Sequence, residues 1–146
     1  MTGLELLRAI AAGEAPGAPI AELMGFEPVE AEEGRVVFAC VPEHRHYNPI
    51  GTVHGGLAAT LLDSAMGCAV HTTLPAGVGY TTLELKVNFT RPITSETGRV
   101  LCEGSVVHRG GRVATAEGRV VAEGSGKLLA HGTTTCLIAS LNGDSP

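Results

Sequence analysis

The sequence has few aromatic side chains and no excess of positive charge. Aromatic residues make up 3% of the chain, and tryptophan is absent. We therefore expect a hydrophobic core built from aliphatic and small side chains. The formal net charge is −5 at pH 7. This charge argues against a nucleic-acid partner, because phosphate binding requires a basic surface.

Segments typical of secretion or of a membrane span are also missing. Residues 1–17 lack the basic start and long apolar run of a signal peptide. The longest apolar stretch, residues 57–70, is too short to cross a bilayer and contains Asp63. These absences predict a cytoplasmic protein with no membrane partner.

The cysteines are too widely spaced to form a CxxC redox motif or a zinc knuckle. They are Cys40, Cys68, Cys102 and Cys136. Each lies in an apolar stretch, which predicts small buried side chains with free thiols, as expected in a reducing cytoplasm. No metal site is expected.

The order of apolar and polar residues predicts one α+β domain over residues 1–146, with its core over about 20–139. Runs of strands that follow a single long helix favour an antiparallel sheet packed around that helix. The expected elements are short helices within residues 1–25 (the first over 3–12), a strand over 35–41, a long helix over 54–73, and strands over 81–91, 99–108, 112–123 and 127–139. Residues 142–146 are expected to form a frayed tail.

Two of these elements have informative patterns. The helix over 54–73 is apolar around most of its circumference, which predicts burial on most sides. In the strand over 81–91, apolar residues alternate with polar ones, which predicts one face on the core and one in solvent. The apolar positions are Leu83, Leu85, Val87 and Phe89.

Asp63 is an unusual residue at the centre of the apolar helix. An isolated carboxylate removed from water destabilises a fold by several kcal/mol unless it is paired or hydrated. The same helix begins at His54, Gly55 and Gly56, where the first backbone N–H groups lack internal partners and the helix dipole is positive. Because glycine has no side chain to block a ligand, this start could bind a carbonyl oxygen, with Asn48 as a second donor.

Gly55 and Asp63 are too far apart along one helix to act on the same small group. They are eight residues apart, which corresponds to about 12 Å along a helix axis. Two antiparallel copies of the helix would bring Gly55 of one chain opposite Asp63 of the other. We therefore expect a homodimer with two sites at its interface.

Three segments together resemble the hotdog-fold acyl-CoA thioesterases, in the branch typified by the phenylacetic-acid-pathway and Them-type enzymes. These segments are NPIGTVHGGLAATLLD at residues 48–63, the strand ending in NFTRP, and the loop HRGGR at 108–112. The resemblance covers roughly residues 20–139, and the spacing Asn–x5–His-Gly-Gly–x6–Asp is its most specific part. It implies a hotdog fold, a homodimer or a dimer of dimers (a homotetramer), an acyl-CoA substrate, and no cofactor.

The resemblance also implies roles for individual residues. Asp63 would be the catalytic carboxylate, as a general base or as the nucleophile, and the Gly55 N–H would polarise the thioester carbonyl. Asn48 would assist at that carbonyl or orient water, Thr82 would help to hold the water, and His54 would shape the start of the helix.

The CoA moiety would contact Gly56, an arginine after the strand over 81–91, and the basic loop HRGGR. Arginines at one turn of an acidic chain are suited to a phosphate contact. The residues implied are Arg91, His108, Arg109, Gly110, Gly111 and Arg112.

Each candidate also has a structural alternative. Asp63 could pair with an arginine or cap a loop, and Asn48 before a proline is a common turn residue. Thr82 could be an ordinary strand residue, Arg109 and Arg112 ordinary hairpin charges, and His54 a structural histidine. Three further histidines are interpreted as surface or loop residues: His44, His46 and His131.

The sequence leaves alternative functions open. A hotdog-fold enoyl-CoA hydratase or dehydratase would use a histidine and a carboxylate, and this chain has His54 and Asp63. A non-catalytic acyl-CoA binding module is a third possibility. For a thioesterase, the small residues near Asp63 are compatible with aryl-acetyl, aroyl or medium-chain acyl groups.

Overall fold

The computed structural model describes residues 1–141, so the tail expected at 142–146 lies outside the described residues. The chain begins with two short helices, α1 (Gly3–Ala11) and α2 (Pro19–Met24). The longest helix, α3 (Gly55–His71), comes after the second strand. Two single turns of 3-10 helix lie at His44–His46 and Ser95–Thr97.

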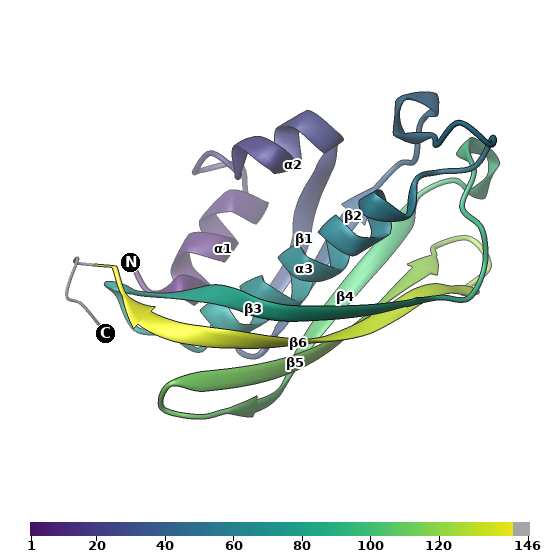
Figure 1. The fold of residues 1–146 in the computed structure, drawn as a ribbon. Coiled ribbons are helices and arrows are strands. Elements are labelled where there is room, and N and C mark those ends of the chain that lie inside the picture. The colour runs from purple at the N-terminus through teal and green to yellow at the C-terminus, as the bar shows by residue number, and fades with distance from the viewer. Residues whose placement is uncertain (142–146) are drawn as a thin grey trace.

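Six strands form one antiparallel sheet that curves around α3 (Figure 1). Their order across the sheet is β1-β2-β4-β5-β6-β3. The strands are β1 (Phe26–Glu32), β2 (Arg35–Cys40), β3 (Val78–Phe89), β4 (Val100–Arg109), β5 (Val113–Ala122) and β6 (Leu128–Ser140). This arrangement confirms the predicted α+β hotdog fold.

Most elements fall within a few residues of their predicted positions, but β1 is not predicted by the sequence pattern. Pro28 and the charged residues around it are typical of a turn. The structure corrects this interpretation: β1 pairs with β2 and forms one edge of the sheet, with a bulge at Val29. An edge strand tolerates proline because one side of its backbone has no ladder partner.

Glycines allow α3 to lie close to the sheet. Gly104, Gly118 and Gly132 occupy one register row across β4, β5 and β6. A Cβ at Gly104 would collide with the backbone of Ala65 in α3, and a Cβ at Gly118 would crowd Met66. The core is aliphatic, as predicted, and no residue of α3 is fully exposed, which confirms its burial on most sides.

The predicted alternation in β3 is wrong at Leu83 and at Phe89, which is 59% exposed at the end of the strand. The register between β3 and β6 shifts between Thr82 and Glu84, so that Leu83 is a bulged residue and is 57% exposed. A bulge reverses the direction of the side chains that follow it. Thr82 therefore points toward α3, and so do Leu85 and Val87 beyond the bulge.

The cysteines are all free, and three of them are buried, as predicted. Cys68 is half-buried on α3. Within residues 1–141, no helix combines the length and the hydropathy that a bilayer span requires.

Candidate active site

Asp63 lies on the one accessible stripe of α3. We define this stripe as the half-buried residues of the helix: Gly55, Gly56, Ala59, Thr60, Asp63, Ser64, Cys68 and His71. The carboxylate is therefore not in the core. Its Oδ1 accepts a hydrogen bond from Thr82 Oγ1 at 2.8 Å. Within the described part of the chain no arginine pairs with Asp63, so that structural alternative is not observed.

The bulge in β3 makes the contact between Thr82 and Asp63 possible. Thr82 pairs with Cys136 of β6 immediately before the bulge, and its side chain is half-buried. Without the extra residue at position 83, a strand that buried Leu85 and Val87 would turn Thr82 to the opposite face. The structural alternative of an ordinary exposed strand residue therefore does not describe Thr82.

The start of α3 has one backbone donor without a partner. His54 is the N-cap residue, and its Nδ1 accepts from the Gly56 N–H at 2.7 Å. The Leu57 N–H donates to the His54 carbonyl. Among residues 1–141, no group accepts from the Gly55 N–H. Gly55 is therefore the free donor at this helix start, whereas the amide of Gly56 is already used.

A pocket of about 350 Å³ borders the free donor. Its walls come from the loop before α3, the first turn of α3, and the end of β3. Asn48, Thr52, Gly55, Phe89 and Arg91 line it, among others. The sequence-predicted residues Asn48, Gly55, His54 and Arg91 thus come together around one pocket.

The Asn48 side chain is turned into its own loop. Its Oδ1 accepts from the Ile50 and Thr52 N–H groups at 3.0 and 3.2 Å, and its Nδ2 donates to Thr52 Oγ1 at 2.9 Å. These contacts fit the turn alternative. Asn48 shapes the pocket wall, and its amide would have to exchange a loop contact to reach a ligand.

The two groups of candidate residues remain apart within one chain. Gly55 contacts Phe89 at the end of β3, whereas Asp63 contacts Thr82, seven residues earlier on the same strand. The helix rise places Gly55 and Asp63 about 12 Å apart along the axis. A single chain therefore does not bring Gly55 and Asp63 together at one small group.

The segment from His108 to Arg112 comprises the end of β4 and its turn into β5, at the end of the sheet away from the start of α3 (Figure 1). Arg109 lies in the same register row as Thr82, across β5 and β6. Three strand spacings correspond to about 14 Å. The segment is exposed, and Arg109 donates to the neighbouring Gly110 carbonyl at 3.3 Å. The segment from His108 to Arg112 lies at the end of the strands nearer to Asp63, whereas Arg91 lies at the end nearer to Gly55.

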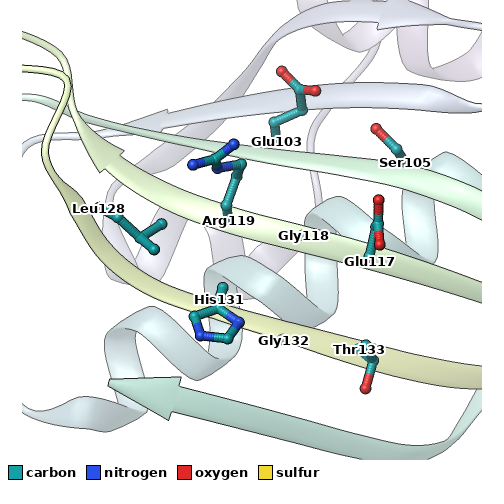
Figure 2. Close-up of a pocket in the computed structure, with 9 residues that line it drawn as sticks. All are labelled: Glu103, Ser105, Glu117, Gly118, Arg119, Leu128, His131, Gly132 and Thr133. Carbon is teal, nitrogen blue, oxygen red and sulfur yellow. The ribbon is translucent and has the colours of Figure 1, made fainter. Parts of the chain in front are cut away.

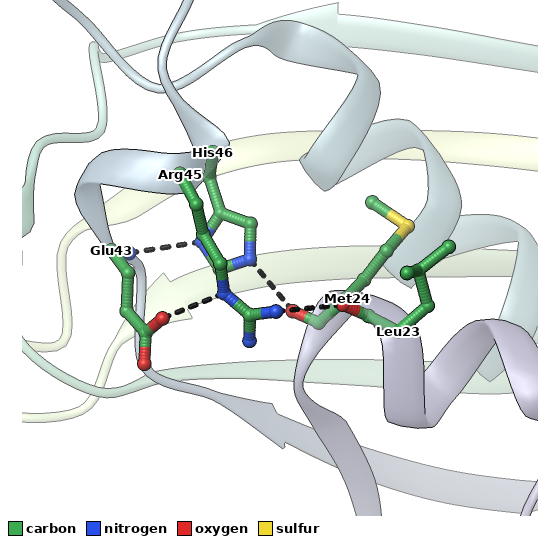
Figure 3. A network of polar contacts seen from close by, with 5 residues as sticks. All are labelled: Leu23, Met24, Glu43, Arg45 and His46. Atoms are coloured by element: carbon green, nitrogen blue, oxygen red, sulfur yellow. Dashed lines mark hydrogen bonds and ion pairs between the residues drawn. The ribbon is translucent and has the colours of Figure 1, made fainter.

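His46 is buried, which corrects its interpretation as a surface or loop histidine. Its Nδ1 accepts from the Glu43 N–H at 2.9 Å, so Nε2 carries the proton and donates to the Met24 carbonyl at 2.7 Å (Figure 3). Its own carbonyl accepts from the His54 N–H at 2.7 Å. His46 thus connects the end of α2 to the N-cap of α3.

Sequence reasoning missed this connection. His44 and His46 have the same polar surroundings in the sequence, and only His46 is directed inward. Arg45 reinforces the same junction, because its guanidinium donates to the Leu23 carbonyl at 2.8 Å and pairs with Glu43 at 2.7 Å (Figure 3). No sequence signal separates the two histidines.

Neighbouring thiols are not nucleophiles at neutral pH. Burial raises the pKa of Cys68 to about 11, and burial also raises the pKa of Cys136. Both therefore remain protonated thiols, and a thiol is a much weaker nucleophile than a thiolate. The reactive groups on this face are the Asp63 carboxylate, the Thr82 hydroxyl and the Gly55 N–H.

A hollow of about 470 Å³ on the other side of the sheet is a separate feature. It is lined by side chains of β4, β5 and β6 that point away from α3, including Glu103, Glu117, Arg119 and His131 (Figure 2). Because the sheet lies between this hollow and α3, it does not share residues with the Asp63 region.

Comparisons with known proteins show the family to which the chain belongs. Residues 50–129 match the family model described as the thioesterase superfamily. The chain is 36% identical over 104 residues to a predicted esterase of Halobacterium salinarum. The match covers 67% of this chain and 66% of the esterase, so the chain spans just under two thirds of that relative's length. Human acyl-coenzyme A thioesterase 13 is 31% identical over 108 residues, covering 73% of this chain and 75% of the relative.

A solved structure is similar over most of its length. It is a mutant of the phenylacetic acid degradation protein PaaI from Thermus thermophilus. The TM-score is 0.74 at 31% sequence identity, and the match covers 82% of this chain and 98% of that chain.

Proposed function

Because the chain belongs to the thioesterase superfamily, we propose that it hydrolyses acyl-CoA thioesters to a free acid and CoA. The observation that carries this proposal is the combination of a carboxylate held by a hydroxyl, at Asp63 and Thr82, with an unpaired helix N-terminal donor at Gly55. The similarity to acyl-coenzyme A thioesterase 13 supports CoA thioesters as the substrate class.

The reaction needs few groups because a thiolate is a good leaving group. In one course, Asp63 takes a proton from water, the water oxygen bonds to the acyl carbon, and the C–S bond then breaks. The CoA sulfur leaves as a thiolate and recovers the proton from Asp63. In the other course, an Asp63 oxygen bonds to the acyl carbon, the C–S bond breaks, and the CoA thiolate leaves. Water then cleaves the resulting mixed anhydride to the free acid and the Asp63 carboxylate, and the proton that this releases goes to the thiolate. The Gly55 N–H stabilises the developing oxyanion in both.

Two subunits are required to complete each site. The separation of Gly55 from Asp63 supports a homodimer in which Gly55 of one subunit lies opposite Asp63 of the other. β3 is the free edge of the sheet on this side, and its Leu83 and Phe89 are 57% and 59% exposed. A strand at the edge of a sheet has unpaired backbone N–H and C=O groups along one side, which a second chain can pair with. The proposal extends to a dimer of dimers, the homotetramer implied by the resemblance.

Basic residues at both ends of the composite site would hold CoA. Arg91 borders the pocket beside Gly55, and the segment from His108 to Arg112 lies toward Asp63 of the same chain. In the proposed dimer these two groups come from different subunits. Arginine side chains are well suited to bind the phosphates of the nucleotide, because their N–H groups can form bidentate hydrogen bonds. Gly56 would allow close passage of the pantetheine arm.

The hydratase alternative is not favoured by the geometry. It requires a histidine and a carboxylate to converge on one substrate, but the His54 Nδ1 is engaged by the Gly56 N–H. The polar pair observed at Asp63 is with a threonine, which suits a bound water.

The test is release of free CoA from a panel of acyl-CoAs, from acetyl through medium-chain to phenylacetyl and hydroxybenzoyl. Asp63→Ala is assayed beside the wild type, and both are checked for oligomeric state by size-exclusion chromatography. We expect hydrolysis by the wild type and its collapse in the variant. Binding of acyl-CoA without CoA release would instead establish a non-catalytic module, and addition of water to an enoyl-CoA would establish a hydratase.

A single turnover in ¹⁸O-labelled water distinguishes the two roles of Asp63. If Asp63 is the base, the label enters the acid product directly. If it is the nucleophile, water that attacks the Asp63 carbonyl of the anhydride puts the label in the Asp63 carboxylate, where mass spectrometry of the protein would find it. Because attack at the acyl carbonyl would label the acid instead, label in Asp63 is the diagnostic result.

A further inference from the structure

Tyr80 interrupts the accessible stripe of α3 one helical turn beyond Asp63. The stripe is accessible in successive pairs, at residues 55 and 56, 59 and 60, and 63 and 64. In the next pair only Cys68 is accessible, and Gly67 is buried although it has no side chain. The ring of Tyr80 covers it: a Cβ built on Gly67 would lie 2.5 Å from Tyr80 Cε2 and 2.7 Å from its hydroxyl.

The strand geometry explains this position. Tyr80 and Thr82 are two residues apart on β3, so their side chains point to the same face of the sheet. Thr82 contacts Asp63, and Tyr80 contacts the following turn of α3. The Tyr80 ring also lies near the ring of His71, with 5.7 Å between centroids. Tyr80 thus forms a wall immediately past the carboxylate.

The wall is held in place from several sides. The Tyr80 hydroxyl lies beside the Cys68 side chain, and the ring packs against the core. Burial raises the pKa of Tyr80 well above its usual range, so the hydroxyl remains neutral. A neutral, partly buried ring is an apolar surface suited to the hydrocarbon part of a ligand.

The acyl group of a substrate would meet this wall. In the proposed dimer, the stretch of α3 between Gly55 and Asp63 lies against the same stretch of the second subunit. An acyl group whose carbonyl is held near Gly55 and Asp63 would, in this dimer, extend past Asp63 toward the C-terminal end of α3. From Asp63 to Gly67 the helix rises about 6 Å.

We propose that Tyr80 is the specificity-determining residue that limits the length of the acyl group. Shorter chains end before the Tyr80 ring, and longer chains collide with it. This inference rests on the proposed function and goes beyond it, because it assigns acyl-length selection to a side chain outside the catalytic set. Gly67 contributes by leaving room for the ring.

The test compares acyl-length profiles of the wild type, Tyr80→Ala, Tyr80→Leu and Gly67→Ala. Straight-chain acyl-CoAs of increasing length serve as probes, and kcat/KM is measured for each. In both Tyr80 truncations we expect the ratio of kcat/KM for long over short chains to rise about tenfold or more, since one methylene in a pocket is worth that much. Gly67→Ala should lower the same ratio, because its Cβ pushes the ring toward Asp63.

Tyr80→Phe is the matched control. It retains the ring and removes only the hydroxyl, so its length profile should equal that of the wild type. Thermal melts and size-exclusion chromatography establish that each variant folds and assembles, and Tyr80→Leu retains more core packing should Tyr80→Ala be unstable.

The outcomes separate this inference from the proposed function. CoA release by the wild type with an unchanged length preference in the folded Tyr80 variants would overturn the inference alone. A shifted profile in Tyr80→Phe would assign selection to the hydroxyl and would also overturn it. No CoA release from any probe by the wild type would overturn the proposed function and the inference together.

Discussion

The two faces of the sheet hold their carboxylates in opposite ways. On the outer face, Glu103 lies 3.1 Å from Arg35, and Glu123 lies 2.7 Å from Arg99. All four side chains are at least 34% exposed. On the side of α3, Asp63 is half-buried, accepts from a hydroxyl, and has no cation beside it within residues 1–141.

This difference predicts that the carboxylates of the outer face affect stability and that Asp63 affects the reaction. An exposed ion pair is solvated and contributes about 0–1 kcal/mol to stability. A cation beside a carboxylate favours its charged form and so makes it a weaker base. A carboxylate held only by a hydroxyl remains able to take a proton or attack. We therefore expect the outer carboxylates to affect folding slightly and the inner one to affect turnover strongly.

The largest expected effect is on turnover when the inner carboxylate loses its charge. Asp63→Asn preserves the shape of the side chain but removes the base or nucleophile, so kcat/KM should fall by about 10²- to 10⁴-fold. Steady-state CoA release measures the fall. Glu103→Gln makes the same chemical change on the outer face and should leave kcat/KM unchanged. Equal losses in both variants would refute the distinction between the faces.

The next effect concerns the free donor at the start of α3. Gly55→Pro removes the N–H at the first helical position, where proline is well tolerated. The preceding residue, His54, has φ −58° and ψ 134°, a conformation compatible with a following proline. We expect kcat/KM to fall by about 10²- to 10³-fold, the usual cost of losing one oxyanion donor.

Gly55→Ala is the control for that substitution. Its Cβ would approach Phe89 Cζ to 3.0 Å, so it adds the steric effect but keeps the N–H. It should therefore lose much less activity than Gly55→Pro. A similar loss in both variants would show that space at position 55 matters and that the donor does not.

A smaller effect is expected when the hydroxyl beside Asp63 is removed. Thr82→Val keeps the shape of the side chain and deletes the hydrogen bond to Asp63, whereas Thr82→Ser keeps the bond. A hydrogen bond to a charged group is worth about 1.5–3 kcal/mol. We expect kcat/KM to fall at least about tenfold in Thr82→Val and to change little in Thr82→Ser. A valine variant with full activity would mean that the hydrogen bond from Thr82 to Asp63 has no part in turnover.

The sequence predicts elements whose pattern is regular and misses those that depend on a single irregular residue. The helix at α3 and the strands at β4, β5 and β6 follow clear periodicities, and their bounds agree within a few residues. β1 is missed because Pro28 and its charged neighbours resemble a turn. The bulge at Leu83 is missed because β-bulge positions depend on pairing with β6, which the order of residues alone does not display.

In the candidate site, too, the sequence predicts some residues and misses the contacts that depend on the fold. Asp63 is predictable because a carboxylate in an apolar helix is conspicuous, and Gly55 because it begins that helix. The contact between Thr82 and Asp63 depends on the bulge, and the burial of His46 depends on the distant carbonyl of Met24. Contacts of this kind arise only when separate elements come together in the fold.

The smallest expected effect is on the outer face, where Arg35 contacts both Glu30 at 2.9 Å and Glu103 at 3.1 Å. Arg35→Met keeps much of the aliphatic stem and removes both contacts. Because these groups are exposed, the free energy of unfolding should fall by about 1 kcal/mol or less, and the difference should shrink at high salt. Urea unfolding at low and high ionic strength measures it. A loss of several kcal/mol that persists in high salt would mean that the outer face stabilises the fold through buried electrostatics, and the contrast with Asp63 would disappear.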